Sequence, residues 1–487
     1  MPVPTPKWRM MNFHSMLRST STSSFALVLA AAVTLLALSG IADAVKIRGQ
    51  RADDTLVESA VRKLLEDRVQ LIYAQIQVGD PPQNFTVTFD TGSSELLLPG
   101  AKCSSGSCVS HQRYDVQAST TGRELFKKGT QTRVFGLHAK VDAAVMKDKV
   151  CVGTWCAPSA QFLSARDMSD ELFDQLPYDG ILGLGLSSES FGMGMKEGVV
   201  DPATLPSSLK KDQSLNLFQN FVESKALKNN QFALWFRSAV DPPGEKSGIT
   251  FGSHDPNRMA SKMYWFPVPY PANHWALPIS DFVMAHQSDM STALTEEPLK
   301  LCEPAPKKCT VLFDSASPLM ILSRPVFERV KEAIATGYPR KPVSDAELAD
   351  CQPLQMKMPK IGISFRGVTF YLDPEDYVDK TGNICLYRFQ VMEGDQNLIY
   401  LGRPWLEKYY TVFDRDSLKI GLALSKHART VEISDAISDE EVTTTSTTTT
   451  TTTTLELEEV VAAEATPAAV GNPTEATSAT VNLLTGS

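Results

Sequence analysis

The chain has 487 residues, of which 43% are hydrophobic and 21% are charged, so it can form more than one globular domain. Its formal net charge of -9 argues against nucleic acid as a general partner, because nucleic-acid binding requires a basic face. We expect a soluble protein that acts as a monomer.

The chain begins with a predicted targeting segment, residues 1–44. Lys7 and Arg9 precede an apolar run at 25–38, and small residues at 42–44 offer a cleavage site. The run is shorter than the roughly 20 residues of a membrane span, which favours a cleaved signal peptide. A retained signal-anchor is the alternative, because the leader before the run is long. The membrane is a partner only in that second case.

From residue 71 to about 424 the pattern is mostly that of β-strands. Residues 71–78 alternate in character and are followed by the Gly/Pro turn 79–82. Helices are predicted at 215–223 and 325–336. The preceding stretch, 45–70, is highly charged and contains the spacing of a short amphipathic helix.

The C-terminal stretch, residues 431–487, has a different composition. Acidic residues lead into a run of threonines at 443–454 that only Ser446 interrupts. Such a sequence buries too little apolar surface to fold, so we expect a disordered Thr-rich tail.

Eight cysteines indicate an oxidising compartment. They fall into four pairs along the sequence: Cys103/Cys108, Cys151/Cys156, Cys302/Cys309 and Cys351/Cys385. Spacing alone does not fix the pairing. Zinc binding is the competing interpretation, but paired Cys-x-x-Cys motifs are lacking, so we favour disulfides and expect no metal or cofactor. The sequon Asn84-Phe85-Thr86 predicts glycosylation at Asn84 in the same compartment.

Two similar segments each place an aspartate at the end of an apolar strand. The first is 87–94, with Asp90 in Asp-Thr-Gly-Ser-Ser, and the second is 311–318, with Asp314 in Asp-Ser-Ala-Ser-Pro. A buried ionised carboxylate is costly unless it is paired or hydrogen-bonded. Two carboxylates in contact share one proton, which supplies an acid and a base in one site.

Each half also contains an apolar-apolar-Gly element at a similar distance after its aspartate. These elements end at Gly183 and at Gly402. Glycine there would allow close approach of two backbones. The repeated arrangement suggests duplicated lobes.

With these residues in view, the chain resembles the pepsin-like (A1 family) aspartic endopeptidases over residues 71–424. Gly79–Phe85, the intact Asp90–Ser94 motif, Tyr178–Gly185 and Leu401–Asp414 carry the resemblance. It implies a mostly β, bilobal fold with an active-site cleft between two related lobes, at 71–240 and 241–430. It also implies that residues 45–70 are a short prosegment and that a water activated by Asp90 and Asp314 hydrolyses a polypeptide substrate at acidic pH.

The resemblance assigns supporting roles to the two turns. These residues are Thr91, Gly92 and Ser93 in the first turn and Ser315, Ala316 and Ser317 in the second. The hydroxyls of Ser93 and Ser317 would hydrogen-bond the outer carboxyl oxygens, and Ser315 would cross-link the turns. Three of the cysteine pairs match family disulfides, and Cys151/Cys156 is an addition.

The sequence departs from the family in three places. Ala316 replaces a glycine, which would be strained if the site demanded a positive φ, and Pro318 removes a backbone donor. The substrate-covering flap matches best at Phe135 and Gly136, in place of Tyr-Gly, and Leu97 stands where its Trp partner is expected. A catalytically impaired protein that binds peptides or proteins is therefore the alternative function. A structural surface protein whose tail is the functional part is a third.

Overall fold

The computed structural model describes residues 72–428, apart from isolated positions and the segments 126–130, 136–138, 170–172, 187–214, 288–293, 303–308, 337–346, 350–357 and 393–397. It also describes 433–435, 479–482 and 484–485. The predicted targeting segment, the charged stretch 45–70 and the threonine run lie outside the described residues. No helix among the described residues is long and apolar enough to cross a membrane.

The N-terminal half forms a nine-stranded sheet. In sheet order its strands are β28 (Leu484–Thr485), β1 (Ile72–Val78), β2 (Gln83–Asp90), β8 (Gly180–Gly183), β3 (Leu96–Pro99), β7 (Trp155–Met168), β6 (Ala139–Val152) and β4 (Arg123–Glu124), and β5 (Gln131–Phe135) also pairs with β6. In β1 the side chains of Ala74, Ile76 and Val78 are buried while Gln75 and Gln77 are exposed. This alternation is the strand pattern that the sequence predicted.

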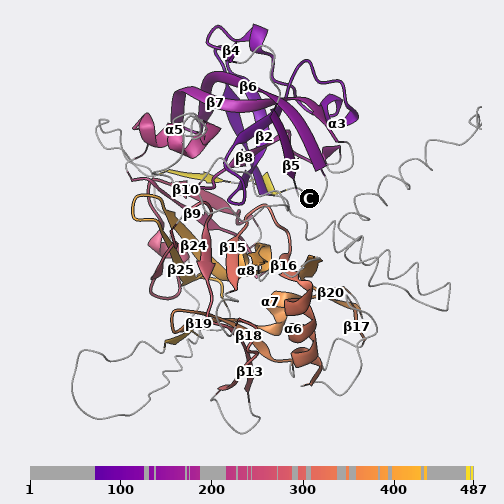
Figure 1. The fold of residues 1–487 in the computed structure, drawn as a ribbon. Helices are drawn as coiled ribbons and strands as arrows, with labels where there is room; N and C mark the ends of the chain where they lie inside the picture. The colour runs from indigo at the N-terminus through magenta and orange to yellow at the C-terminus, as the bar shows by residue number, and fades with distance from the viewer. Residues whose placement is uncertain are drawn as a thin grey trace, which may run out of the picture.

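A six-stranded sheet lies between the two halves of the molecule (Figure 1). Its order is β11 (Tyr264–Pro267), β25 (Lys419–Leu424), β24 (Tyr409–Asp414), β9 (Gln231–Trp235), β10 (Gly248–Phe251) and β27 (Ala479–Asn482). Phe232 of β9 stacks on Phe413 of β24 with ring centroids 4.8 Å apart, and Trp275 packs edge-on against Phe413 at 5.1 Å. These aromatic contacts join strands from both halves of the chain into one core.

The C-terminal half contains three further sheets. One is ordered β12 (Ala276–Pro278), β15 (Thr310–Phe313), β23 (Leu398–Leu401), β16 (Met320–Ser323) and β22 (Phe389–Met392). Another is ordered β14 (Leu294–Pro298), β13 (Phe282–Gln287), β18 (Lys360–Phe365), β19 (Val368–Leu372) and β26 (Ile433–Asp435). The third is ordered β17 (Glu347–Ala349), β21 (Ile384–Tyr387) and β20 (Val378–Thr381).

The helices are short and lie between the strands. They are α3 (Gly106–Val109), α5 (Leu217–Glu223), α6 (Arg324–Thr336), α7 (Pro374–Tyr377) and α8 (Arg403–Lys408), with 3-10 turns at Val116–Ala118 and Pro256–Arg258. The helices predicted at 215–223 and 325–336 are confirmed as α5 and α6. The mostly β, bilobal fold is therefore as the sequence predicted, and the exact boundary between the lobes stays a prediction.

The prediction of a tail without structure from 431 to 487 is wrong at three short segments. Strand β26 pairs with β19, β27 pairs with β10, and β28 pairs with β1. Backbone N–H and C=O groups at the edges of these sheets accept any extended segment, whatever its side chains. Composition cannot reveal such pairing, because it reports only how much apolar surface a segment can bury.

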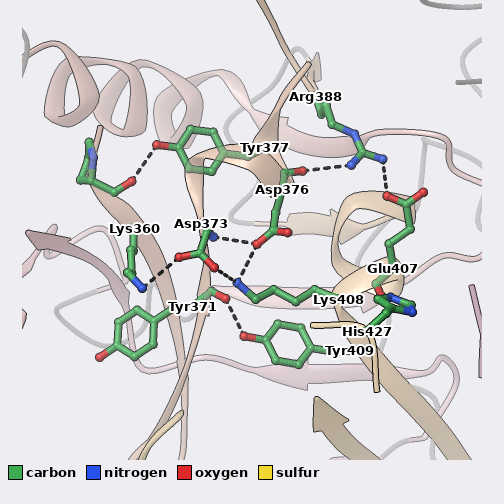
Figure 2. Close-up of polar contacts among 11 residues, drawn as sticks. Lys360, Tyr371, Asp373, Asp376, Tyr377, Arg388, Glu407, Lys408, Tyr409 and His427 are labelled. Atoms are coloured by element: carbon green, nitrogen blue, oxygen red, sulfur yellow. Dashed lines mark hydrogen bonds and ion pairs between the residues drawn. The ribbon is translucent and has the colours of Figure 1, made fainter. Parts of the chain in front are cut away.

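The second lobe contains a buried network of ion pairs, part of which is drawn in Figure 2. It comprises Lys360, Asp373, Asp376, Arg388, Arg403, Glu407 and Lys408. Glu407 accepts from the Arg388 guanidinium at 2.8 Å and from the Arg403 guanidinium at 2.6 Å. The backbone N–H of Arg403 donates to the Ser317 carbonyl at 2.9 Å, so the network is connected to the turn that carries Asp314.

Candidate active site

The two aspartates are positioned by the same strand arrangement. Strand β2 ends at Asp90 and runs parallel to β8, with Asp90 opposite Gly183. Strand β15 ends one residue before Asp314 and runs parallel to β23, with Phe313 opposite Leu401. Each carboxyl group therefore projects from the end of a buried strand, as the repeated sequence segments predicted.

Gly183 and Gly402 are required by close backbone contact. A Cβ added at Gly183 would lie 2.4 Å from the backbone nitrogen of Glu95. A Cβ at Gly402 would lie 2.1 Å from the carbonyl oxygen of Leu319. Both glycines press against the chain that leaves the aspartate turn, so the prediction of close approach from the paired apolar-apolar-Gly elements is confirmed.

The structure brings Asp90 and Asp314 together, and their carboxyl groups hydrogen-bond each other. A Cβ placed on Gly92 would lie 3.1 Å from Asp90 Oδ1 and 3.3 Å from Asp314 Cγ, so both groups crowd the first turn. The Gly92 N–H donates to Asp90 Oδ1 at 2.7 Å, and the Ala316 N–H donates to Asp314 Oδ1 at 3.0 Å. Corresponding backbone donors therefore hold both carboxyl groups.

The two turns are cross-linked by side-chain hydroxyls. Thr91 Oγ1 donates to the Phe313 carbonyl at 2.7 Å, and Ser315 Oγ donates to the Phe89 carbonyl at 2.6 Å. The Thr91 N–H also donates to Ser315 Oγ, and the Ser315 N–H donates to Thr91 Oγ1, each at 3.0 Å. Ser315 thus forms the cross-link expected of it, without the methyl group of a threonine.

The serines at the outer side of each turn differ from each other. Ser93 Oγ donates to Asp90 Oδ2 at 2.5 Å, as expected. Ser317 Oγ instead donates to the carbonyl of Leu319 at 2.8 Å, so the expectation that it hydrogen-bonds Asp314 is wrong. Ser317 supports that carboxyl group through its backbone N–H, in addition to the Ala316 N–H, and not through its hydroxyl.

The replacement of glycine by Ala316 introduces no backbone strain. Among the described residues, positive φ angles outside glycine occur at Lys225, Lys300, Arg366 and Leu418, and not at Ala316. Gly92 in the first turn also lacks a positive φ. The strain considered from the sequence therefore does not arise, because neither position needs the conformation that favours glycine.

The electrostatics of the pair follow from burial and from unequal hydrogen bonding. Burial raises the pKa of Asp90, and hydrogen bonds from Ser93 and from the Gly92 backbone oppose that rise. Burial and then the charge of Asp90 raise the pKa of Asp314 to about 7. The ionised form is therefore favoured more at Asp90, which accepts from the Ser93 hydroxyl, than at Asp314, whose pKa the charge of Asp90 raises further.

Two tyrosines lie close to the pair, and the sequence analysis gave neither of them a role in the site. Burial and the charge of Asp90 raise the pKa of Tyr178, and burial and the charge of Asp314 raise that of Tyr400. Tyr178 packs beside Ile181 and Leu97 in one apolar cluster, and Tyr400 belongs to a separate one. Each aspartate therefore has a mostly apolar neighbourhood with a phenol close by.

The flap residues predicted from the sequence are only partly within the described residues. Phe135 ends β5, whose partner β6 begins at Ala139, so a β-hairpin is present where the flap is expected. Gly136 lies outside the described residues, and the flap role of both stays a prediction. Leu97 is 1% exposed and packs in the core of the first lobe.

The remaining residues singled out from the sequence are the cysteines and Asn84. Disulfides Cys103–Cys108, Cys151–Cys156 and Cys302–Cys309 are present, with Cα atoms 5.9, 4.1 and 5.1 Å apart. Cys351 lies outside the described residues, so its pairing with Cys385 stays a prediction. Asn84 is exposed on β2, where its amide oxygen accepts from Gln77 at 3.4 Å.

Comparison with known proteins identifies the family. The model of the family described as eukaryotic aspartyl protease matches residues 72–425. Chymosin of Camelus dromedarius is 26% identical over 353 residues, covering 72% of this chain and 80% of its own. Cathepsin E of Cavia porcellus is 26% identical, and the match covers 75% of this chain and 84% of cathepsin E. A probable vacuolar protease A of Arthroderma benhamiae is also 26% identical, and the match covers 76% of this chain and 82% of that protein. The chain therefore belongs to the eukaryotic aspartyl protease family.

Proposed function

We propose that this protein is an endopeptidase in which Asp90 and Asp314 activate a water molecule for attack on a peptide bond. The observation that carries the proposal is the hydrogen-bonded carboxyl pair, in which burial and mutual charge raise the pKa of Asp314 to about 7 while Ser93 and Gly92 stabilise ionised Asp90. A pair with one proton offers a base and an acid to the same substrate.

The roles follow from this inequality. Asp90, as the carboxylate, takes a proton from the attacking water, whose oxygen forms a bond to the peptide carbonyl carbon. Asp314 gives its proton to the carbonyl oxygen, so the tetrahedral intermediate is neutral. The proton on Asp90 then passes to the leaving nitrogen as the C–N bond breaks, and the intermediate returns a hydroxyl proton to Asp314. The pair ends with the one proton with which it began.

The cross-linked turns would keep this geometry fixed. The Thr91 and Ser315 hydroxyls each donate to the carbonyl that precedes the opposite aspartate, so the two lobes cannot move apart without losing both hydrogen bonds. A shift of about 1 Å in reacting groups costs on the order of 100-fold in rate. Retention of both hydroxyls is therefore what an active enzyme requires.

We infer an extended polypeptide substrate with apolar side chains beside the cleaved bond. The apolar clusters around Tyr178 and Tyr400, one next to each aspartate, support this preference. The relatives named as vacuolar proteases support a place in the secretory or vacuolar route. We place the pH optimum on the acidic side of the pKa of Asp314.

Cleavage of a mixed peptide library by the purified protein over pH 3–7 tests the proposal. We expect cleavage that a statine-containing peptide inhibits and that Asp90→Asn and Asp314→Asn each abolish. Cleavage that persists in either variant would refute the assigned roles.

The alternative function is peptide or protein binding without turnover. Pro318 and the missing hydroxyl contact to Asp314 motivate it, because both set the second turn apart from the first. In the same assay, tight capture of peptides without cleavage, unchanged by Asp90→Asn, would favour this alternative.

A further inference from the structure

An ion pair connects the hairpin strand β5 to the chain that leaves the first aspartate turn. Arg133 Nε donates to Glu95 Oε2 at 2.8 Å, and Arg133 Nη2 donates to Glu95 Oε1 at 2.7 Å. This is the two-bond fork in which an arginine and a carboxylate fix each other's position as well as their charges. The Glu95 side chain is 3% exposed and that of Arg133 is 17% exposed, so the pair is largely shielded from water.

Glu95 is a rigid anchor for this pair. It follows Ser94 at the end of the Asp90 turn, and its carbonyl accepts from the Gly183 N–H at 2.9 Å. Its backbone also forms a bridge with Asn216, whose side-chain amide donates to the Gly185 carbonyl at 2.8 Å. The backbone of Glu95 is therefore held by the elements that position Asp90.

Strand β5 has less support of its own. Its strand partner is β6, to which residues 131–135 pair in register, and it lies off the main path of the nine-stranded sheet. Arg133 is held on β5 by its neighbours, since Gln131 Oε1 accepts from Nη2 at 2.6 Å and the Thr132 carbonyl accepts from Nη1 at 3.2 Å. The guanidinium therefore fixes the edge strand β5 relative to Glu95.

We propose that Arg133 and Glu95 are positioning residues that hold β5 against the turn of Asp90, so that the hairpin and the carboxyl pair keep a fixed relation during peptide hydrolysis. The kinetic part of this inference rests on the proposed function. Phe135 and Leu97 stand at the positions where a flap-to-body hydrogen bond between side chains is expected. Neither side chain has a polar group, so they cannot form it. The ion pair provides a connection between the same hairpin and the strand that begins at Leu96.

The test uses Arg133→Gln, Glu95→Gln, the double variant and Arg133→Lys in the full chain. Each single Gln variant removes the ion pair and its two-bond fork, and we expect kcat/KM to fall by about 10- to 100-fold. Arg133→Lys keeps the charge but loses the two-bond fork, so its kcat/KM should lie between those of wild type and Arg133→Gln. The double variant should be more active than either single variant, because two amides can pair without a stranded charge. The pH limits of activity should not move, since the donors to Asp90 and Asp314 are unchanged.

Amide hydrogen exchange of residues 131–135 provides a readout that does not depend on activity. We expect exchange there to speed up by about tenfold in the single variants, with strands β9 and β24 unchanged. Arg258→Gln and Glu245→Gln are the matched controls, because Arg258 and Glu245 form an ion pair of the same 2.7 Å length at the loops flanking β10. They should change neither kcat/KM nor exchange in β5.

The outcomes separate the two proposals. If kcat/KM and β5 exchange in Arg133→Gln and Glu95→Gln stay within about twofold of wild type, or if the controls change as much, the positioning role is overturned. If wild type does not cleave peptides, the proposed function is refuted, and hydrogen exchange alone then decides whether the ion pair holds β5. Should Arg133→Gln not fold, Arg133→Lys gives the same two readouts.

Discussion

Substitution of Ser93 by alanine should move the acid limit of activity, because the Ser93 hydroxyl stabilises the ionised form of Asp90. The hydroxyl donates to Asp90 Oδ2 at 2.5 Å in a buried site, and among the causes that lower the pKa of Asp90 it is the largest. Burial raises that pKa, and without the hydroxyl this effect of burial is less opposed. Asp90 in Ser93→Ala therefore becomes protonated at a higher pH than in wild type.

The size of the shift follows from the strength of the lost hydrogen bond. A hydrogen bond to a charged group contributes about 1.5–3 kcal/mol. One pKa unit corresponds to about 1.36 kcal/mol. The acid limb of the plot of kcat/KM against pH should therefore move to higher pH by about 1–2 units. The alkaline limb, where Asp314 loses its proton near its pKa of about 7, should stay close to its wild-type position. Both limbs report the pair as a coupled unit.

Ser317→Ala is the matched control for this experiment. Its hydroxyl occupies the corresponding place in the second turn but donates to the Leu319 carbonyl at 2.8 Å. Neither limb should move, although some stability is lost with the hydrogen bond. The reasoning is refuted if Ser317→Ala shifts a limb as far as Ser93→Ala, or if Ser93→Ala moves the acid limb downward.

Substitutions at three further positions test the frame around the pair. Ala316→Gly should change kcat/KM by less than about threefold, since no positive φ is relieved, and a large gain in activity would show that the alanine impairs the site. Ser315→Ala should lower kcat/KM by about 100-fold while Ser315→Thr stays near wild type, and equal activity in both would exclude the cross-link as a determinant of geometry. Burial raises the pKa of Glu407, but Arg388 and Arg403 outweigh it and lower that pKa from 4.5 to about 2. Glu407 therefore stabilises the fold fully above pH 4.5 and loses that contribution as pH falls through about 2. Glu407→Gln should reduce the free energy of unfolding by about 3–5 kcal/mol at pH 5, measured by urea denaturation, and a deficit that grows toward pH 2 would contradict this.

The features of the site that the sequence predicted are those that the backbone dictates. Asp90 and Asp314 follow apolar strands, and Gly183 and Gly402 are placed where a Cβ cannot fit. Sterics and strand pairing impose these constraints, and they produce a regular pattern of residue types along the chain. The Ser315 cross-link was instead expected from the family resemblance, because it needs only a hydroxyl at a fixed place in the turn.

The features that the sequence did not reveal depend on side-chain choice between several nearby partners. The hydroxyl of Ser317 donates to the carbonyl of Leu319, two residues along the chain, and no pattern of residue types indicated that partner. Arg133 and Glu95 are far apart along the chain, and nothing in their immediate neighbours signals that they meet. Strands β27 and β28 pair with β10 and β1, and strand pairing of this kind is not visible in composition.

The departures of the second turn from the first fit a division of roles between the two aspartates. A group that acts as the base must ionise at acidic pH, and Asp90 accepts hydrogen bonds from both a hydroxyl and a backbone N–H. A group that acts as the acid must keep its proton, and fewer donors to its ionised form favour this. Turning the Ser317 hydroxyl away from Asp314 has that effect, while the Ala316 N–H still orients the carboxyl group. The altered second turn thus raises the proton affinity of Asp314 without removing the contacts that place it beside Asp90.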